Sequence, residues 1–207
     1  MSDPLAILAV MDTASDYVVV DVETSGTNPA TDRVLSIAAL TVSHNGTVGR
    51  TLHSLLDAGV DPGPTNIHGL TAAMLTGQQR FRDKAPTLAR LLRGRILVAH
   101  NVAFDYAFLA AEARRSNTTL PVTSVLCTVE LSKLLHLELD SLRLASLAHH
   151  WDVPQTKPHD ALDDARVLAS ILAYSLARAM ALNIRLPLRS PSTLQLPTFS
   201  DFTTRAA

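Results

Sequence analysis

The most strongly patterned stretch of the chain is a valine-rich run from Tyr17 to Thr24. Branched apolar side chains in so short a run favour a buried β-strand. Because side chains two positions apart point to the same face of a strand, the carboxylates of Asp21 and Glu23 point the same way, and the valines at the alternate positions take the other face. A polar turn at 25–28 then ends the strand. Burying two like charges side by side costs several kcal/mol unless something positive compensates, so we interpret these two acids as metal ligands.

The rest of the chain alternates between strand and helix patterns. Apolar runs predict further strands at 33–42, 48–55, 95–100 and 122–127, and Asn45-Gly46 is a strong hairpin signal between the first two. Apolar spacing and turn residues predict helices at 5–11, 72–75, 85–93, 101–112, 131–135, 142–151 and about 160–182. Three strands joined by short turns form an antiparallel meander, and strands separated by helices add in parallel. The pattern therefore predicts an α/β protein with a five-stranded mixed sheet flanked by helices.

The helix predicted at 101–112 sets an acidic residue into an apolar face. At helical spacing, one side of it carries Asn101, Phe104, Asp105, Phe108 and Leu109. A carboxylate in such surroundings needs a compensating partner, which makes Asp105 a candidate functional residue.

The last predicted helix carries three aspartates, and periodicity distinguishes between them. Asp164 falls in the inward stripe of large apolar residues, whereas Asp160 and Asp163 fall mostly on the opposite side, where a solvated charged face explains them. Asp164 is therefore the predicted inward acid. His159, at the entry to this helix, is free to overhang the same site.

Composition and charge limit the kinds of function that the chain can have. With 207 residues, 47% of them hydrophobic, the chain is long enough for one α/β domain with a substantial core and a trailing segment. The formal net charge of −1 gives no general basic field, which argues against a histone-like or repressor-like binder. A nucleic-acid partner would have to be held at a local site.

The cysteine count and the N-terminal sequence bear on the compartment. Cys127 is the only cysteine, so no internal disulfide can form, and a reducing compartment is expected. The N-terminal segment lacks a basic leader, and its apolar run is too short to span a membrane. We expect a cytoplasmic protein with no membrane partner.

Several histidines allow more than one interpretation. His100 ends a predicted strand just before Asn101, where a structural role and a substrate contact are equally compatible with the sequence. His149, His150 and Trp151 lie together at a predicted helix end, with no acidic partner in register. Cationic helix capping and an aromatic core contact explain these three better than a ligand site does.

Four short motifs together resemble those of a known enzyme family. They are Asp-Val-Glu-Thr-Ser-Gly at 21–26, Ile-His-Gly-Leu-Thr at 67–71, His-Asn-Val-Ala-Phe-Asp at 100–105, and His-Asp-Ala-Leu-Asp-Asp at 159–164, which fits H-x-A-x-x-D. In this order and on these elements, they resemble the DEDDh, or DnaQ-like, 3′-5′ exonucleases, the family of the proofreading epsilon subunit of bacterial DNA polymerase III. The resemblance covers roughly residues 16–182.

This resemblance implies a fold and a set of functional residues. The implied fold is ribonuclease-H-like, with the exonuclease domain at 1–182. The implied ligands of two divalent cations, Mg²⁺ or Mn²⁺, are Asp21, Glu23, Asp105 and Asp164, and the implied general base is His159. The implied pocket for the terminal nucleotide is lined by Thr24, Ile67, His68, Asn101 and Phe104.

The implied reaction is attack of water on the last phosphodiester at the 3′ end of single-stranded or frayed DNA, in proofreading or repair. Each turnover releases a nucleoside 5′-monophosphate. Two hard cations held by carboxylates can bind both the attacking and the leaving oxygen of such a reaction. Histidine suits proton removal because its unperturbed pKa lies near neutrality.

Other functions remain open on the sequence alone. Exonucleases that trim RNA 3′ ends carry the same acids, although the motifs at 21–26 and 67–71 look more like those of proofreading relatives and favour DNA. A non-catalytic replisome or nucleic-acid-binding module could use the same fold, but it would not need four acids and a histidine. A phosphatase with an aspartyl nucleophile begins in a similar way, but it has no role for the H-x-A-x-x-D motif.

The segment 183–207 differs in composition from the rest of the chain. It contains several prolines among Ser, Thr and Arg, shows no amphipathic helix pattern, and is expected to be a disordered or loosely docked tail. Within it, Gln195-Leu-Pro-Thr-Phe199 resembles the short peptides by which replication enzymes bind the sliding clamp. The clamp and a polymerase are therefore candidate partners.

Overall fold

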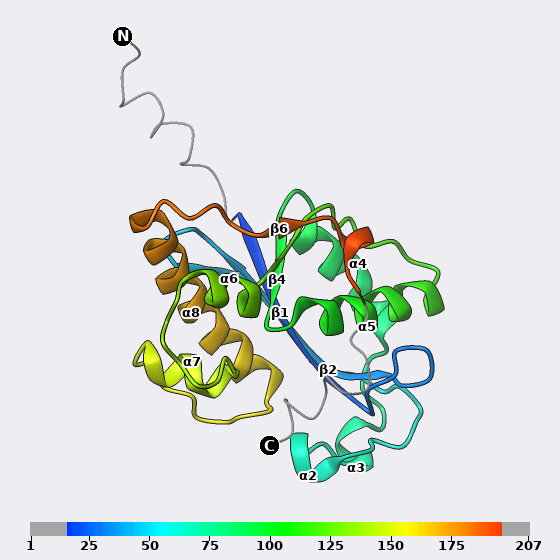
Figure 1. The fold of residues 1–207 in the computed structure, drawn as a ribbon. Coiled ribbons are helices and arrows are strands. Elements are labelled where there is room, and N and C mark those ends of the chain that lie inside the picture. Colours follow the sequence, from blue (N-terminus) through cyan, green and yellow to red (C-terminus); the bar gives the residue numbers. More distant parts are fainter. Residues whose placement is uncertain (1–15, 196–207) are drawn as a thin grey trace.

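A six-stranded mixed sheet separates two layers of helices in the computed structural model, which describes residues 16–195 (Figure 1). The helix expected at 5–11 and most of the clamp-like motif lie outside the described residues. The strands are β1 (Tyr17–Thr24), β2 (Val34–Val42), β3 (Val48–Leu55), β4 (Ile96–Ala99), β5 (Val125–Cys127) and β6 (Leu188–Arg189). Their order in the sheet is β3-β2-β1-β4-β5-β6, so β1 occupies a central position.

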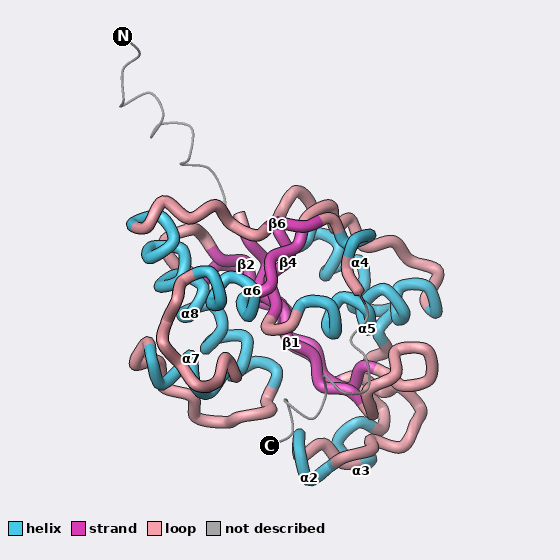
Figure 2. The backbone as a smooth tube through the Cα atoms, viewed as in Figure 1, coloured by secondary structure: helices cyan, strands magenta, loops and turns pink. Residues whose placement is uncertain are grey.

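The strand pairing agrees with the predicted topology. The pairs β1–β2 and β2–β3 are antiparallel, as expected of a meander, and β4 and β5 add in parallel. Figure 2 shows these strands at the centre of the molecule, with helices on both sides. The parallel additions follow from the helical crossover between successive strands. The predicted mixed α/β sheet is therefore confirmed.

The sheet has one strand more than the five predicted. β6 pairs antiparallel with β5 and comes from the segment expected to be a disordered or loosely docked tail. Ile184 and Leu186 pack against one core, Leu194 packs against the other, and the Arg189 guanidinium lies 3.0 Å from the Glu130 carboxylate. With two residues, β6 is too short to show an alternation of apolar and polar positions in the sequence. Its position is set by pairing with the open edge of β5.

Within residues 16–195, seven α-helices complete the fold. They are α2 (Thr65–His68), α3 (Ala72–Leu75), α4 (Phe81–Leu92), α5 (Val102–Arg115), α6 (Thr128–Leu134), α7 (Leu144–His150) and α8 (Ala161–Ala181). A 3₁₀ turn at Pro191–Thr193 follows β6. Six of the seven agree with a predicted helix to within a few residues at each end. The exception, α2, is a single turn that the sequence analysis left unassigned.

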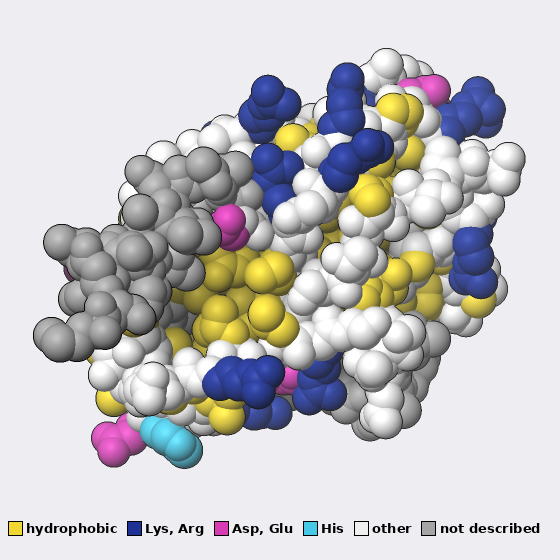
Figure 3. Space-filling view, turned by 90° about the horizontal axis from the view of Figure 1, so that it is seen from above, with side chains coloured by type: hydrophobic (Ala, Val, Ile, Leu, Met, Phe, Trp, Pro, Cys, Tyr) yellow, Lys and Arg dark blue, Asp and Glu magenta, His cyan; other side chains and the backbone are white. Residues whose placement is uncertain are grey.

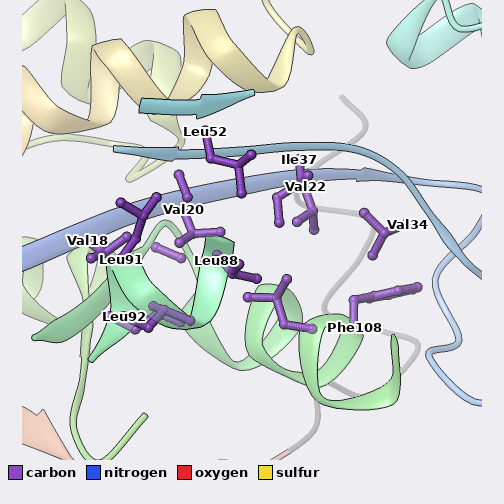
Figure 4. Close-up of a cluster of buried hydrophobic side chains, with 14 of the residues drawn as sticks. Val18, Val20, Val22, Val34, Ile37, Leu52, Leu88, Leu91, Leu92 and Phe108 are labelled. Atoms are coloured by element: carbon purple, nitrogen blue, oxygen red, sulfur yellow. The ribbon is translucent and has the colours of Figure 1, made fainter. Parts of the chain in front are cut away.

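Each face of the sheet has its own hydrophobic core. The valines at 18, 20 and 22 pack with α4 and α5, including Leu88, Leu92 and Phe108 (Figure 4). Tyr17 and Val19 instead pack with α6, α7 and α8. The alternation predicted for β1 is thus confirmed, and it directs Asp21 and Glu23 toward the α8 side. Between residues 16 and 195, none of the helices has the length and apolar character needed to cross a membrane.

Candidate active site

A pocket of about 290 Å³ lies at the carboxyl end of β1. Its wall combines this strand end with the turn that follows it, α2, the first residues of α5 and α7, and the segment leading into α8. Eight of the ten residues predicted for the site line it: Asp21, Glu23, Thr24, Ile67, His68, Phe104, His159 and Asp164. Segments far apart in sequence therefore meet at one end of the central strand.

The two acids of β1 reach the pocket because the strand ends there. Asp21 is buried and Glu23 is half-buried, and the pairing register with β2 shifts between Glu23 and Thr24. Such irregularities bend a strand and re-aim its side chains, and they are common next to active sites. The register shift thus separates the regular part of β1 from the polar turn that forms one wall of the pocket.

Asp164 is positioned by two hydrogen bonds. The side-chain amide of Gln155 donates to Oδ1 at 2.7 Å, and the backbone N–H of His159 donates to Oδ2 at 3.0 Å. Burial raises the pKa of the Asp164 carboxyl, although these two hydrogen bonds and the nearby His159 ring oppose the rise. The charged carboxylate is therefore held in a costly environment, which a bound cation would relieve.

The other two aspartates of α8 organise the chain around the site. Asp160 caps the helix by accepting from the N–H groups of Leu162 and Asp163. Asp163 accepts from the backbone N–H groups of Thr156 and Lys157 and from the Thr156 hydroxyl. Although partial burial alone would raise the pKa of Asp163, these hydrogen bonds lower it below its ordinary value. Both acids thus have structural roles beyond the solvated face that the sequence suggested.

The side chains of Glu23, His159 and Asp164 form a group that fits a divalent cation. One ligand atom from each lies within 4.8 Å of the other two. Carboxylate oxygens suit hard cations such as Mg²⁺ and Mn²⁺, and imidazole binds transition metals. His159 itself has a φ of 63°, a left-handed conformation that is uncommon for residues other than glycine. Such strain often occurs at functional sites, where the surrounding structure maintains it.

Asp105 and Asn101 are the two predicted site residues that do not line the pocket. Asp105 lies in the first turn of α5, one residue after Phe104, and its side chain is fully buried. Asn101 precedes the helix in a left-handed conformation, with a φ of 69°. Each is the chain neighbour of a residue that does line the pocket, Phe104 for Asp105 and His100 for Asn101.

Both ring nitrogens of His68 are engaged by the chain. The backbone N–H of Leu70 donates to Nδ1 at 3.0 Å, and Nε2 lies 3.2 Å from the carbonyl oxygen of Pro62. This arrangement fits a neutral ring with its proton on Nε2, and burial lowers the pKa of His68, which favours the neutral form. His68 therefore presents ring carbons to the pocket, while its nitrogens hold the segment that carries Ile67.

His100, His150 and Trp151 make contacts that bear on the interpretations left open by the sequence. His100 lines the pocket and at the same time has Nδ1 3.0 Å from the Thr128 hydroxyl, so both of its proposed roles are compatible with the structure. Trp151 stacks on Tyr174 with ring centroids 5.5 Å apart, and His150 meets its edge. The aromatic contact expected at Trp151 is present.

Arg143 and Gln155 are among the pocket residues that were not identified from the sequence. Among the described residues that line the pocket, Arg143 is the only lysine or arginine, and Gln155 is the donor to Asp164. Arg143 immediately precedes α7, and Gln155 lies in the irregular segment before α8. Neither position belongs to a periodic pattern. The only available signal was that both precede the H-x-A-x-x-D motif, Gln155 by four residues and Arg143 by 16.

A mixed sheet with this strand order, helices on both faces and acids gathered at the end of the central strand defines an α/β protein of the ribonuclease-H-like class. The model of the RNase_T family, whose description is exonuclease, matches residues 18–172. The chain therefore belongs to this exonuclease family. The matched range contains the four acids and the histidine predicted for the site.

Curated relatives agree with this assignment. A Mycobacterium tuberculosis protein described as a candidate bifunctional exonuclease/endonuclease is 36% identical over 166 residues, which cover 75% of this chain and 26% of that protein. The Bacillus subtilis 3′-5′ exonuclease DinG is 30% identical over 158 residues, covering 75% of this chain and 17% of DinG. The chain thus spans about a quarter or less of the length of these two relatives.

A shorter relative and a solved structure complete the comparison. DNA polymerase III subunit epsilon of Treponema pallidum is 29% identical over 160 residues, which cover 76% of this chain and 74% of that subunit. Exonuclease I of E. coli, solved in complex with a dT13 oligonucleotide, superposes with a TM-score of 0.68. That match covers 81% of this chain and 42% of the other at 21% identity, and it shows the shared fold.

Proposed function

We propose that this protein is a divalent-metal-dependent 3′-5′ exonuclease that acts on single-stranded or frayed DNA and releases nucleoside 5′-monophosphates. The observation that carries the proposal is the convergence of Glu23, His159 and Asp164 on one pocket, in a chain that belongs to an exonuclease family. The direction of degradation is supported by the name of the DinG relative, a 3′-5′ exonuclease. The exonuclease domain proposed at 1–182 contains the whole matched range.

The residues proposed to hold two cations are Asp21, Glu23, Asp105 and Asp164. Three of these acids line the pocket, and Asp105 is a buried residue next to the pocket residue Phe104 in sequence. Mg²⁺ or Mn²⁺, when bound, would lower the pKa of the attacking water and neutralise negative charge on the phosphate. The donor set fits this assignment because carboxylates concentrated at the end of a buried strand need positive charge to offset their repulsion.

His159 is proposed to remove the proton from the attacking water. Its ring shares a pocket with Glu23 and Asp164, and its backbone N–H is fixed by hydrogen bonding to the Asp164 carboxylate. This bond and the cap at Asp160 fix the entry to α8, so the imidazole is carried by a constrained segment. A positioned base of this kind typically contributes about 10²–10⁴-fold to the rate.

The terminal nucleotide is proposed to lie between apolar and basic groups of the pocket. Ile67, Phe104 and Leu144 offer apolar surface against which a base can stack or pack, and Thr24 and His68 lie on the same wall. Arg143 supplies positive charge suited to a phosphate. We propose DNA as the preferred substrate, and a polymerase and the sliding clamp as candidate partners, since several relatives are named as polymerase III proteins.

The direct test is degradation of 5′-labelled single-stranded DNA and RNA of matched sequence, with Mg²⁺, Mn²⁺ or EDTA, beside Asp21→Ala. We expect products that shorten from the 3′ end, faster on DNA, with cleavage abolished by EDTA and by the substitution. Faster cleavage of RNA would instead identify an exoribonuclease. Absence of cleavage of either polymer would reject the nuclease and favour a binding module on the same fold.

Gln155 is expected to set the metal affinity of the site. Hydrogen bonds to a ligating carboxylate typically change metal affinity by about 10–100-fold. Gln155→Leu removes the donor to Asp164, so we expect the Kd for Mn²⁺, measured by calorimetry on the metal-free protein, to rise by about tenfold or more. The matched control is Gln78→Leu, which removes a side-chain amide bonded to the Met74 carbonyl on the surface. Equal affinities in the two variants would contradict the assignment.

A further inference from the structure

Positive charge is concentrated in one short segment of the chain. Residues 80–95 contain six lysines and arginines and one acidic residue. Because the formal net charge of the whole chain is −1, the +5 of this segment leaves −6 on the rest. We call five of these side chains the α4 basic face: Arg80, Arg82, Lys84, Arg90 and Arg93. The net charge of the whole chain therefore does not reveal that residues 80–95 are strongly basic.

The α4 basic face is built on the outer side of one helix. The apolar side of α4, including Phe81, Leu88 and Leu92, is buried against the sheet and α5. Arg82, Arg90 and Arg93 are exposed on the outer side, and the 11 residue steps from Arg82 to Arg93 correspond to about 16 Å along the helix axis. This length allows one extended polyanion to meet several of the charges.

Little of this charge is neutralised within the molecule. In the part of the chain that the structure describes, the α4 basic face makes one ion pair, in which Arg82 Nε lies 3.8 Å from Asp83 Oδ1. Both side chains are well exposed, so solvent screens the pair. Asp83 also caps α4 by accepting from the backbone N–H of Arg80. Figure 3 shows one face of the molecule on which Lys and Arg side chains project at several places.

We propose that the α4 basic face is a second nucleic-acid contact, which binds the phosphate backbone of nucleotides beyond those in the pocket. The proposal rests on the proposed function for its choice of a nucleic acid over an acidic protein. α4 packs on the sheet face opposite α8, away from most of the pocket acids (Figure 1). Along the chain, α2 with the pocket residue Ile67 is followed by α3 and then by α4, so the pocket and the α4 basic face are carried by nearby segments of the sequence.

A basic surface of this kind offsets the electrostatic repulsion between the acidic pocket and a nucleic acid. Three acids line the pocket against one arginine, so before cations bind it repels a polyanionic substrate. A cationic face elsewhere on the surface raises the local concentration of the nucleic acid and speeds association, in a salt-dependent way. Short substrates that fill only the pocket gain nothing from it, so the effect depends on substrate length.

The test compares two variants that remove the same charge. One combines Arg82→Gln, Arg90→Gln and Arg93→Gln, and the control combines Arg114→Gln, Lys133→Gln and Arg185→Gln, which are exposed elsewhere. Binding of labelled oligo(dT)30 and oligo(dT)4 is measured by fluorescence anisotropy across a salt series, with EDTA present to prevent cleavage. Thermal unfolding of each variant verifies that it is folded.

For oligo(dT)30, we expect the first variant to bind at least about tenfold more weakly at low salt, with a salt dependence of log K shallower by about 2, near 0.7 per lost phosphate contact. Oligo(dT)4 should bind all three proteins alike. Coincident curves for the variant and the control, or an equal loss for both lengths, would overturn the proposal. Cleavage of oligo(dT)4 with Mn²⁺ by the unmodified protein tests the nuclease separately, so either hypothesis can fail alone.

Discussion

Replacing Asp164 with Asn is expected to slow phosphodiester cleavage by about a thousandfold while the metal-free protein stays folded. Asp164 contributes the buried carboxylate of the Glu23, His159 and Asp164 group. Stabilisation of transition-state charge by a cation is worth several kcal/mol, and about 4 kcal/mol corresponds to a thousandfold in rate. Asn keeps the size of the side chain but removes the charge that attracts the cation. Initial rates on labelled single-stranded DNA with Mn²⁺ provide the measurement.

The same substitution should leave the stability of the metal-free protein nearly unchanged. Burial raises the pKa of the Asp164 carboxyl, so keeping it ionised at neutral pH costs folding free energy when no cation is bound. Asn removes this cost, but it can accept only one of the two hydrogen bonds that the carboxylate accepts, so the midpoint of thermal unfolding in EDTA should change little in Asp164→Asn. The stabilisation that Mn²⁺ confers on the unmodified protein should be lost. A variant that is inactive because it unfolds in EDTA would contradict this account.

Asp160→Asn is the matched control for this experiment. It makes the same chemical change one turn earlier, at a residue that caps α8 and does not line the pocket. Asn is as good an N-cap as Asp, so stability and activity should both remain close to those of the unmodified protein. Equal loss of activity in the two variants would indicate that charge near α8, rather than the Asp164 carboxylate, is what matters.

Most of what could be predicted from the sequence concerned residues within regular strands and helices. Alternation along β1 placed Asp21 and Glu23 on the α8 side, and the period of α8 selected Asp164 over Asp163. Both predictions depend only on residues within one strand or one helix, where the direction of a side chain follows from its position. The order of the motifs along the chain then indicated that these elements form one site. Eight of the ten predicted residues line the same pocket.

Contacts between irregular segments could not be predicted in this way. Arg143 and Gln155 reach the pocket from chain without periodicity, and the engagement of both His68 ring nitrogens depends on how Pro62 and Leu70 fold around it. β6 is likewise set by the open edge of β5.

The sequence of α5, however, contains a second buried acid that the sequence analysis did not identify. Glu112 follows Asp105 by seven residues, which places a second acid on the same buried side of the helix.

Glu112→Gln is expected to lower the free energy of unfolding by about 3 kcal/mol. The Glu112 side chain is 1% exposed and accepts from Arg33 Nε at 2.6 Å, Arg33 Nη2 at 3.0 Å and Arg115 Nη1 at 3.3 Å. Removing one partner of a buried ion pair leaves its counter-charges uncompensated, at a typical cost of about 3–5 kcal/mol. We place the effect at the lower end because both arginines are about a quarter exposed. Urea unfolding at neutral pH measures it.

The loss should extend to the pocket, because this cluster holds the connection between β1 and β2. Arg115 donates to the carbonyls of Pro29 and Ala30, and the same connection supplies pocket-lining residues at 26 and 27. We therefore expect a higher KM for DNA in Glu112→Gln at temperatures where the variant is fully folded. Glu130→Gln is the control, because its ion pair with Arg189 is exposed and should contribute at most about 1 kcal/mol. If both variants lost the same stability, the buried cluster would contribute no more than a surface ion pair, and the pocket turn would need another source of rigidity.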